Sequence, residues 1–424
     1  MKIGEVSDPD IHPDSEIANV DVEEFRAEVQ AFLSARFELR DPEADDERDD
    51  IIARAPDGHQ AFVDRARDLQ RELAAAGLSG VHIPVEYGGR GLSHAHVQVI
   101  EQELRRYDAP SLRPLRIGMH LAVGTLLASG SEAQKERYLP ALISADEQWC
   151  QLFSEPDAGS DLVSLRTRAV LDGDEWVIDG QKVWSSYAAG AHFGLLLART
   201  DPDAPKPHVG ITMFVLPMDA AGVTIRPLVD IAGGMHFNEV FLEGVRLGAD
   251  AVIGEVNKGW AVSQGTLGGE RSGYMGGSGG GRRFRQVVKA ARAAGSIDDP
   301  VVRDRMMRVV TAERVLEWLR DRYLGGTLAA GNPAAGSMMK LAGGSLEQQC
   351  SELIADIAGA RGQAWDPTDR DGDIVSHDLN ATRQSRIAGG THQIQRNLLG
   401  ERVLGLPREP DPYQGRPWRE VPRS

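Results

Sequence analysis

The chain has 424 residues, which is long for one core, so two or three packed domains are expected. The formal net charge of -16 argues against a nucleic-acid partner, because binding phosphate requires a basic surface. No run is long and apolar enough for a signal peptide or a membrane span, which predicts a cytoplasmic protein. Cys150 and Cys350 are too few for a disulfide framework or a thiolate metal site, so we expect two packed thiols.

The first part of the chain has the pattern of a helical domain. After a polar arm, Asp21 is a predicted N-cap, Glu24 completes a capping-box pattern, and apolar residues follow at helical spacing: Val22, Phe25, Val29 and Phe32. The acidic stretch 41–50 lacks the spacing of a calcium loop, and we interpret it as a solvated linker. Further helices are predicted at 62–73, 94–107 and 118–129.

The pattern changes to strands after Trp149. Asp172-Gly173 and Asp179-Gly180 are hairpin-type turn signals around the short run 175–178. Strand-like runs follow, at 192–198, 210–217, 222–228 and 237–242. Because no helices intervene, these runs predict an antiparallel sheet and not a βαβ sheet. From Lys258 onward the period is helical again.

The order predicts a mainly α fold with a central β domain. We expect these parts: a polar N-terminal arm (1–20), an N-terminal helical domain (21–147), a middle antiparallel β domain (148–250) and a C-terminal helical domain (251–424).

Three separated segments have the residue types that chemistry requires. The chain has no dinucleotide fingerprint and no P-loop, and no His/Cys/Asp cluster has ligand spacing, so no metal is expected. Site segment 1 is QLFSEPDAGSD (151–161). Its Gly-Ser pair after a proline turn exposes backbone N–H groups and a hydroxyl, which suits a pyrophosphate or a thioester. Taken alone, a plain loop entering a sheet is the favoured interpretation of this segment.

The other two segments have similar alternatives. Site segment 2, GQKVWSS (180–186), has a tryptophan that can lie against a flat heterocycle with hydroxyls beside it, although a core tryptophan is the commoner case. Site segment 3, GGTHQIQR (389–396), places glycines and a hydroxyl just before a helix, a favourable position for an anion.

Together, in this order and at these separations, the segments resemble the acyl-CoA dehydrogenase family. The stretch IPVEYGG (83–89) is also similar to a first-domain motif of that family, and the resemblance covers roughly residues 22–407. It implies an N-terminal helical domain, an antiparallel β domain and a C-terminal helical bundle. It also implies an FAD enzyme that dehydrogenates an acyl-CoA thioester, an oxidoreductase acting on a CH–CH bond.

The resemblance assigns cofactor and substrate roles residue by residue. Residues of site segment 1 would line the flavin or approach its pyrophosphate and the substrate: Gln151, Leu152, Phe153, Ser154, Gly159 and Ser160. Trp184 would cover one flavin face, next to Ser185, with Ser186 near the reactive flavin nitrogen. The last set of FAD contacts would come from site segment 3: Gly390, Thr391, His392 and Gln393.

The catalytic base departs from the most familiar pattern of the family. Where those members carry a glutamate directly before Gly-Thr, this chain has Gly389, which cannot abstract a proton. Other members carry the glutamate on a C-terminal-domain helix before an arginine, and Glu270-Arg271 matches that pattern. The resemblance therefore implies Glu270 as the base, with Arg271 and Gly389 next to the substrate; a surface Glu-Arg pair is the alternative. The backbone N–H of Gly389 would hold the thioester oxygen.

Glycines crowd the surroundings of Glu270. The stretch GGERSGYMGGSGGG (268–281) has eight glycines, each unfavourable in a helix, so either the helix is kinked or the backbone leaves space for a bulky or branched acyl group.

Two further departures concern partners. The family's segments that reach a neighbouring subunit's FAD are replaced by residues 297–303 and 356–362. The resemblance implies an oligomer, either a homodimer or homotetramer or a hetero-oligomer with a related subunit, and an electron-transfer flavoprotein as the acceptor. Two alternatives stay open: a flavin oxidase or monooxygenase on the same fold, for which His392 beside Thr391 is a hint, and a catalytically silent subunit.

Overall fold

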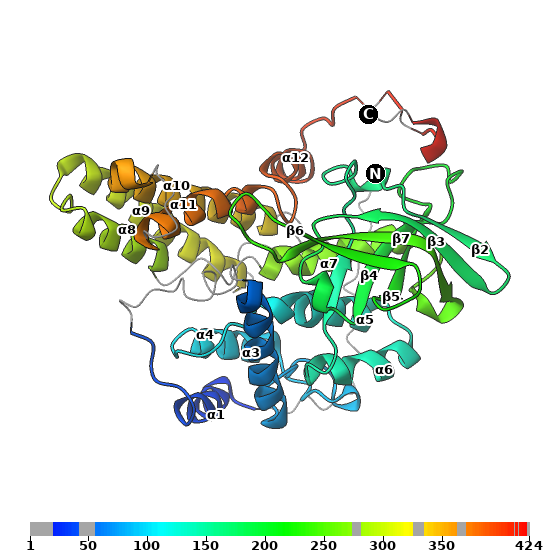
Figure 1. Ribbon diagram of the computed structural model, residues 1–424, viewed down its shortest axis with the longest axis horizontal. Coiled ribbons are helices and arrows are strands. Elements are labelled where there is room, and N and C mark those ends of the chain that lie inside the picture. Colours follow the sequence, from blue (N-terminus) through cyan, green and yellow to red (C-terminus); the bar gives the residue numbers. More distant parts are fainter. Residues whose placement is uncertain are drawn as a thin grey trace.

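A computed structural model gives the structure of the chain and describes residues 20–41, 56–273, 281–324, 335–362, 370–410, 412–413 and 415–421. Figure 1 shows the sheet at the right, the helices from the first third of the chain below, and most helices from the last third to the left. The predicted order of helical, β and helical parts is therefore confirmed.

The first helical part consists of α1 (Val22–Ser34), α3 (Pro56–Ala75), α4 (His94–Leu104), α5 (Val123–Ser129) and α6 (Glu132–Ile143). Asp21 caps α1 as predicted, because its carboxylate accepts hydrogen bonds from the backbone N–H groups of Glu23 and Glu24 at 2.9 and 3.1 Å. Apolar residues of α1, α3 and α4 share one core, among them Phe25, Leu73 and Val99. Most of the acidic stretch 41–50 lies outside the described residues.

The single helix predicted at 118–129 is divided in two. Residues Ile117–Ala122 form the π-helix η3, and α5 follows it directly. Gly118 lets η3 pack closely against α6, because a Cβ atom at this position would lie 2.9 Å from the side chain of Leu142 on α6. A π-helix is rare and has a wider turn than the α-helix, so η3 is a feature that helical periodicity does not predict.

The sheet contains β1 (Trp149–Leu152), β2 (Arg168–Asp172), β3 (Glu175–Lys182), β4 (Phe193–Arg199), β5 (Ile211–Pro217), β6 (Val223–Leu228), β7 (Phe237–Gly248) and β8 (Val252–Ile253). Its order is β6-β7-β3-β2-β4-β5-β8, with β1 paired to β4. Most pairs are antiparallel, but β1 runs parallel to β4, and β2 meets β4 in parallel at one position. The sheet is therefore mixed, because the β2–β3 hairpin returns the chain before β4 begins.

One predicted turn is wrong and one is confirmed. Asp172 pairs with Glu175 across the β2–β3 hairpin, so the turn at Asp172-Gly173 is present. Asp179-Gly180 instead lies inside β3, where the pairing with β7 shifts register after Ile178. A Cβ atom at Gly180 would lie 2.4 Å from the hydroxyl oxygen of Thr167, so close packing, and not a turn, requires the glycine.

The last helical part consists of α7 (Gly259–Gly273), α8 (Arg282–Ala293), α9 (Pro300–Leu324), α10 (Ala335–Ala358), α11 (Arg370–Ala381) and α12 (His392–Arg402). Helices α8 to α10 bury a core that includes Val287, Val309 and Leu346. Helix α7 connects this part to the rest, since it packs against η3, α5 and β5. The hydroxyls of Thr125 on α5 and Thr266 on α7 are both buried and lie 2.7 Å apart.

The two cysteines are buried free thiols, as predicted. Burial raises the pKa of Cys350 to about 12. Among the residues that the structure describes, none of the helices has the length and apolarity needed to cross a bilayer.

Candidate active site

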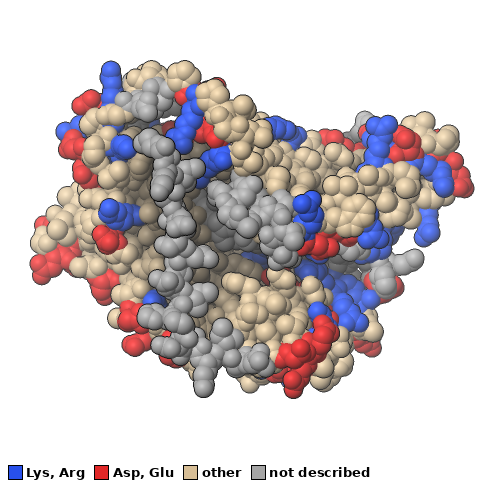
Figure 2. All heavy atoms as spheres, turned by 180° about the vertical axis from the view of Figure 1, so that it is seen from behind, with Lys and Arg blue, Asp and Glu red and all other residues tan. Residues whose placement is uncertain are grey.

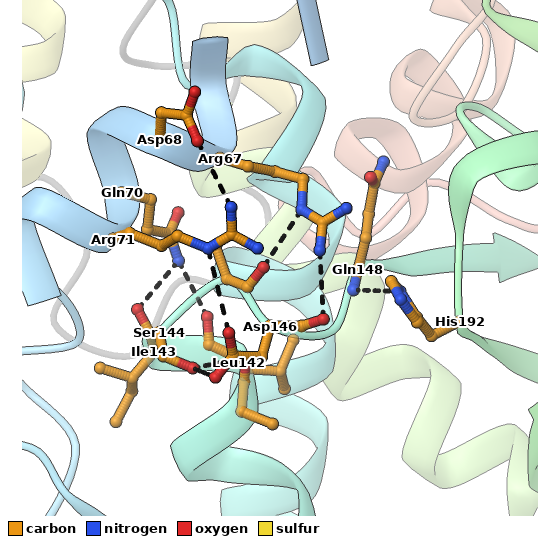
Figure 3. A network of polar contacts seen from close by, with 12 residues as sticks. Arg67, Asp68, Gln70, Arg71, Leu142, Ile143, Ser144, Asp146, Gln148 and His192 are labelled. Carbon is orange, nitrogen blue, oxygen red and sulfur yellow. Dashed lines mark hydrogen bonds and ion pairs between the residues drawn. The ribbon is translucent and has the colours of Figure 1, made fainter. Parts of the chain in front are cut away.

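The start of β1 is fixed by polar contacts between α3 and the end of α6 (Figure 3). Arg67 donates to the carbonyl of Ala145 at 3.2 Å, and Gln70 donates to the carbonyl of Leu142 at 2.8 Å. On the other side, the backbone N–H of Gln148 donates to Nδ1 of His192 at 3.0 Å. These contacts hold the turn ahead of β1, and hence the entry into site segment 1, against two separate parts of the fold.

Site segment 1 continues from β1 into an irregular loop. Leu152 and Phe153 are buried, whereas Gln151 and Ser154 are partly exposed. Gly159 and Ser160 are exposed, and a Cβ atom at Gly159 would meet nothing within 4 Å. The predicted residues therefore divide into an inner pair and an outer set that a ligand can reach.

A buried ion pair anchors this loop to site segment 2. Lys182 is fully buried, and its ammonium donates to Oε1 of Glu155 at 2.7 Å and to the carbonyl of Phe153 at 3.0 Å. Glu155 also accepts from the backbone N–H groups of Arg166 and Thr167. Burial raises the pKa of Glu155, but the charge of Lys182 and the hydrogen bonds outweigh it, so the pKa lies below its usual value. Sequence reasoning missed this pair because its members are 27 positions apart.

Trp184 has the least ordinary conformation in site segment 2. Its φ is 60°, in the left-handed region, and its side chain is 54% exposed. Phe237 of β7 meets the indole edge-to-face, with ring centroids 5.5 Å apart. A bulky residue in this region costs about 1–3 kcal/mol, and such strain concentrates at functional sites. The fold thus keeps a large aromatic surface presented to the outside.

The residues around Trp184 hold that conformation. The backbone N–H of Ser185 donates to the carbonyl of Asn238 at 3.1 Å, and the Asn238 amide donates back to the carbonyl of Ser185 at 3.0 Å. Ser185 is fully buried, and its hydroxyl has no hydrogen-bond partner among the described residues. Ser186 is partly exposed. Asn238 is a positioning residue that the sequence pattern did not indicate.

Site segment 3 forms the entry to α12. Thr391 is the N-cap, and its hydroxyl accepts from the backbone N–H of Ile394 at 3.2 Å. His392 is 1% exposed and Gln393 is exposed. Burial, followed by the nearby positive charges of Arg386, Lys340 and Arg396, lowers the pKa of His392 to about 4. The imidazole is therefore neutral near pH 7 and supports the turn from inside.

A buried glutamine sets the orientation of the glycine pair. Gly389 and Gly390 have φ values of 65° and 90°, and Gln395, fully buried, donates to the carbonyl of Gly389 at 3.0 Å. Because the C=O and N–H of a trans peptide point in opposite directions, the N–H of Gly390 points away from Gln395. Sequence reasoning named the glycines but missed Gln395, which is a second residue of this kind.

The predicted base and its neighbour lie on α7. The structure places the backbone of Glu270 and Arg271 in that helix, and their side chains lie outside what it describes. The glycine-rich stretch is described up to Gly273 and again from Gly281. Helix α7 packs on η3, which also contacts β1, the strand that begins site segment 1.

Site segments 1 and 2 are brought together directly, whereas site segment 3 is held by the last helices. The N–H of Val183 donates to the carbonyl of Ser154 at 3.0 Å. Site segment 3 packs against α10, where a Cβ atom at Gly344 would lie 2.7 Å from Nε2 of His392. The chain after α12 returns to the β domain, since the N–H of Arg419 donates to the carbonyl of Pro202 at 3.2 Å.

Comparison with known proteins identifies the family. The sequence matches three successive domains: "Acyl-CoA dehydrogenase, N-terminal domain" over residues 20–146, "Acyl-CoA dehydrogenase, middle domain" over residues 150–245, and "Acyl-CoA dehydrogenase, C-terminal domain" over residues 257–404. The acyl-CoA dehydrogenase IpdE1 of Mycobacterium tuberculosis is 39% identical over 92% of this chain and 99% of that protein. The chain belongs to the acyl-CoA dehydrogenase family. It is therefore an oxidoreductase of the flavoprotein class that acts on CH–CH donors.

Other relatives agree with this membership. The acyl-CoA dehydrogenase FadE34 of Mycobacterium tuberculosis is 39% identical over 80% of this chain and 46% of its own length. Among solved structures, the "Tcur3481-Tcur3483 steroid ACAD" superposes with a TM-score of 0.74 at 29% identity, covering 92% of this chain and 98% of that one. The ChsE4-ChsE5 complex from Mycobacterium tuberculosis gives 0.71 at 26% identity, covering 91% and 98%.

Proposed function

We propose that this acyl-CoA dehydrogenase uses FAD and that Glu270 removes the α-proton of the acyl thioester. The observation that carries the cofactor part is Trp184, whose indole is 54% exposed in a strained left-handed conformation. A soluble fold gains nothing from exposing a strained tryptophan, but a flat heterocycle lying on it would bury both surfaces.

The cofactor proposal extends beyond Trp184. We propose that the reachable residues of the three segments contact FAD: Gln151, Ser154, Gly159, Ser160, Trp184, Ser186, Gly390, Thr391 and Gln393. Four further residues support these contacts from the interior: Leu152, Phe153, Ser185 and His392, each at most 4% exposed. We separate contacting from supporting residues by their burial, because a side chain with no exposed surface offers no atom to a ligand.

When bound, FAD supplies the acceptor for the β-hydrogen as hydride. The chain supplies the proton acceptor and the geometry. In general, partial desolvation raises the pKa of a glutamate toward the range that a base acting near neutral pH needs. We assign this role to Glu270, since Gly389 has no side chain to perform it. Arg271 and Ser160 are proposed substrate contacts.

The backbone at Gly389 and Gly390 has a second proposed role. Negative charge develops on the thioester oxygen as the α-proton leaves, and fixed N–H donors stabilise such charge. The contact from Gln395 to the carbonyl of Gly389 supports this role, because it turns the N–H of Gly390 outward. Ser154 and Ser186 would position the ring so that the α- and β-carbons face Glu270 and the acceptor.

The substitution Glu270→Gln tests the base. We expect the variant to keep stoichiometric FAD, and anaerobic bleaching of the flavin by an acyl-CoA to slow by about 10²–10⁴-fold, the usual contribution of a general base. Glu255→Gln is the matched control, because Glu255 is an exposed carboxylate just before the same helix.

The same measurements separate the competing functions. Normal bleaching in Glu270→Gln would exclude Glu270 as the base. A colourless wild-type chain would indicate a silent subunit that completes a partner's site. Reduced flavin that reacts rapidly with oxygen to give a hydroxylated product would indicate a monooxygenase in place of a dehydrogenase.

We also propose a bulky acyl group and an oligomeric enzyme that passes electrons to an electron-transfer flavoprotein. The glycines before and after Glu270 support the first proposal, and the relatives include a protein described as a steroid ACAD. The second is supported by relatives solved as complexes of two different chains, such as ChsE4-ChsE5. A linear medium-chain thioester that bleached the flavin faster than polycyclic ones would contradict the wide pocket.

A further inference from the structure

The π-helix η3 carries a histidine into a group of basic side chains. His120 lies on η3, and its Nε2 is 3.9 Å from Oε1 of Glu101 on α4. The ring of His94, the first residue of α4, is 5.1 Å from that of His82. Nδ1 of His82 is buried without a hydrogen-bond partner among the described residues.

Three arginines belong to the same group. Burial lowers the pKa of Arg105, and the positive charges of Arg320 and Arg116 lower it further against the opposing charge of Glu101. Arg116 directly precedes η3, Arg105 directly follows α4, and Arg320 comes from α9. We call this group the cationic cluster: His82, His94, Arg105, Arg116, His120 and Arg320.

Solvent reaches the cationic cluster. The side chain of His120 is 34% exposed, yet burial, together with the charges of Arg116 and His94, lowers its pKa to about 4. Arg105 is likewise exposed although it is desolvated. The exposed side chains of the cluster are therefore accessible to a ligand. Figure 2 shows Lys and Arg side chains gathered to the right of centre on the rear face.

The position of η3 connects the cluster to the candidate active site. This π-helix contacts β1, which begins site segment 1, and α7, which carries Glu270. π-Helices are rare and occur frequently at functional sites, so η3 is a second observation that is independent of the charges. The imidazoles add N–H donors, and the guanidiniums add charge and paired donors that match carboxylate and phosphate oxygens.

We propose that the cationic cluster binds an anionic oxygen group of the substrate, either a carboxylate at the far end of the acyl chain or the 3′-phosphate of the CoA. This inference rests on the proposed function, since it assumes an acyl-CoA between η3 and α7. In this proposal the enzyme recognises a charged group of the substrate away from the reacting carbons. Glu101, at the edge of the cluster, repels anions that are not aligned with the arginines.

The test measures binding in the Glu270→Gln holoenzyme, so that affinity is read without turnover. Isothermal titration calorimetry compares suberyl-CoA, a dicarboxylic thioester, with octanoyl-CoA of equal chain length, each with and without the 3′-phosphate. If the acyl carboxylate is bound, suberyl-CoA binds about tenfold more tightly than octanoyl-CoA, and Arg116→Gln removes the difference. If a CoA phosphate is bound, Arg116→Gln weakens both thioesters equally and has no effect on the dephospho forms.

Arg303→Gln is the control, because Arg303 is an exposed arginine of α9 that pairs only with the exposed Asp298 at 3.8 Å among the described residues. Equal affinities for all four thioesters in Arg116→Gln and its parent would overturn the proposal. The proposed function is read separately, by bleaching of the wild-type flavin. If the wild-type flavin is bleached but Arg116→Gln does not change binding, only this inference fails. If the binding preference is present but the flavin is not bleached, only the proposed dehydrogenation fails.

Discussion

Glu155 and Lys182 form a buried ion pair in the β domain. Removing one member leaves the other charge buried without its partner, which costs about 3–5 kcal/mol. We therefore expect Glu155→Gln to lower the midpoint of urea denaturation. The amount of FAD bound per chain should also fall, because this carboxylate holds the loop of site segment 1 through the N–H groups of Arg166 and Thr167. The double variant Glu155→Leu with Lys182→Met should recover most of the loss.

Arg246→Met provides the matched control for this prediction. Arg246 pairs with Asp172 and Glu175 on the same sheet, but all of these side chains are exposed and solvent screens them. A loss in Arg246→Met as large as that in Glu155→Gln would show that burial is not the cause.

The pKa of Glu155 also predicts a dependence on pH. Its folded-state pKa lies below the unfolded value of about 4.3, so its contribution to stability is full above that pH and is lost as the pH falls through the folded value. Acid titration of unfolding should therefore be less steep below about pH 4.3 in Glu155→Gln than in the wild type. Parallel titration curves would contradict this assignment.

At the scale of elements, α8 depends on a distant residue for its start. Its N-cap, Gly281, offers no side chain, and the carboxylate of Glu313 on α9 accepts from the backbone N–H groups of Arg283 and Phe284 at 3.2 and 3.1 Å. Glu313 is 3% exposed, so water does not reach this position. The two N–H groups therefore depend on the carboxylate as their acceptor.

We expect Glu313→Ala to destabilise the C-terminal helices by about 1–2 kcal/mol, the cost of a lost N-cap. Hydrogen exchange should show faster exchange at the start of α8, and Glu313→Gln, which keeps an acceptor oxygen, should lose less. Glu317→Ala is the control one turn later on α9, and equal effects of both alanine variants would exclude the capping role.

The sequence predicts local elements better than the contacts between them. The cap at Asp21 was predicted because its partners, Glu23 and Glu24, follow it directly. The site segments were found because their residue types match a family pattern. The contacts that hold them were not, since Gln395 reaches back to Gly389 through a folded turn and Glu313 caps a helix 30 positions away. The parallel pairing of β1 with β4 is also non-local, so strand periodicity gave the strands but not their directions.

At the scale of the whole molecule, α9 carries three large apolar side chains on one side that the described residues leave exposed. Met307, Val315 and Trp318 are 57%, 51% and 63% exposed, and at 100° per residue they lie within an arc of about 80°. Such a face is unusual on a monomer. We expect a second chain of the family to bury it, as the solved complexes of paired relatives suggest.

Light scattering tests this expectation on the purified chain. Trp318→Glu should shift the mass from a dimer or larger assembly toward a single chain, because it places a charge in an apolar contact. Val301→Glu is the control, since Val301 is 67% exposed on the same helix but outside that arc. A wild-type chain that is already monomeric would contradict the prediction.

The π-helix η3 has a consequence for how this region tolerates change in length. A π-turn is equivalent to an α-turn with one residue inserted, so deleting a single residue between Ile117 and Ala122 would restore regular α-helix. The residues on either side, Arg116 and Thr125, would then be rotated relative to one another by about 100°. Arg116 could no longer keep its place in the cationic cluster while Thr125 still meets Thr266. Chains one residue shorter here would therefore keep the fold and lose the registration between the cationic cluster and α7.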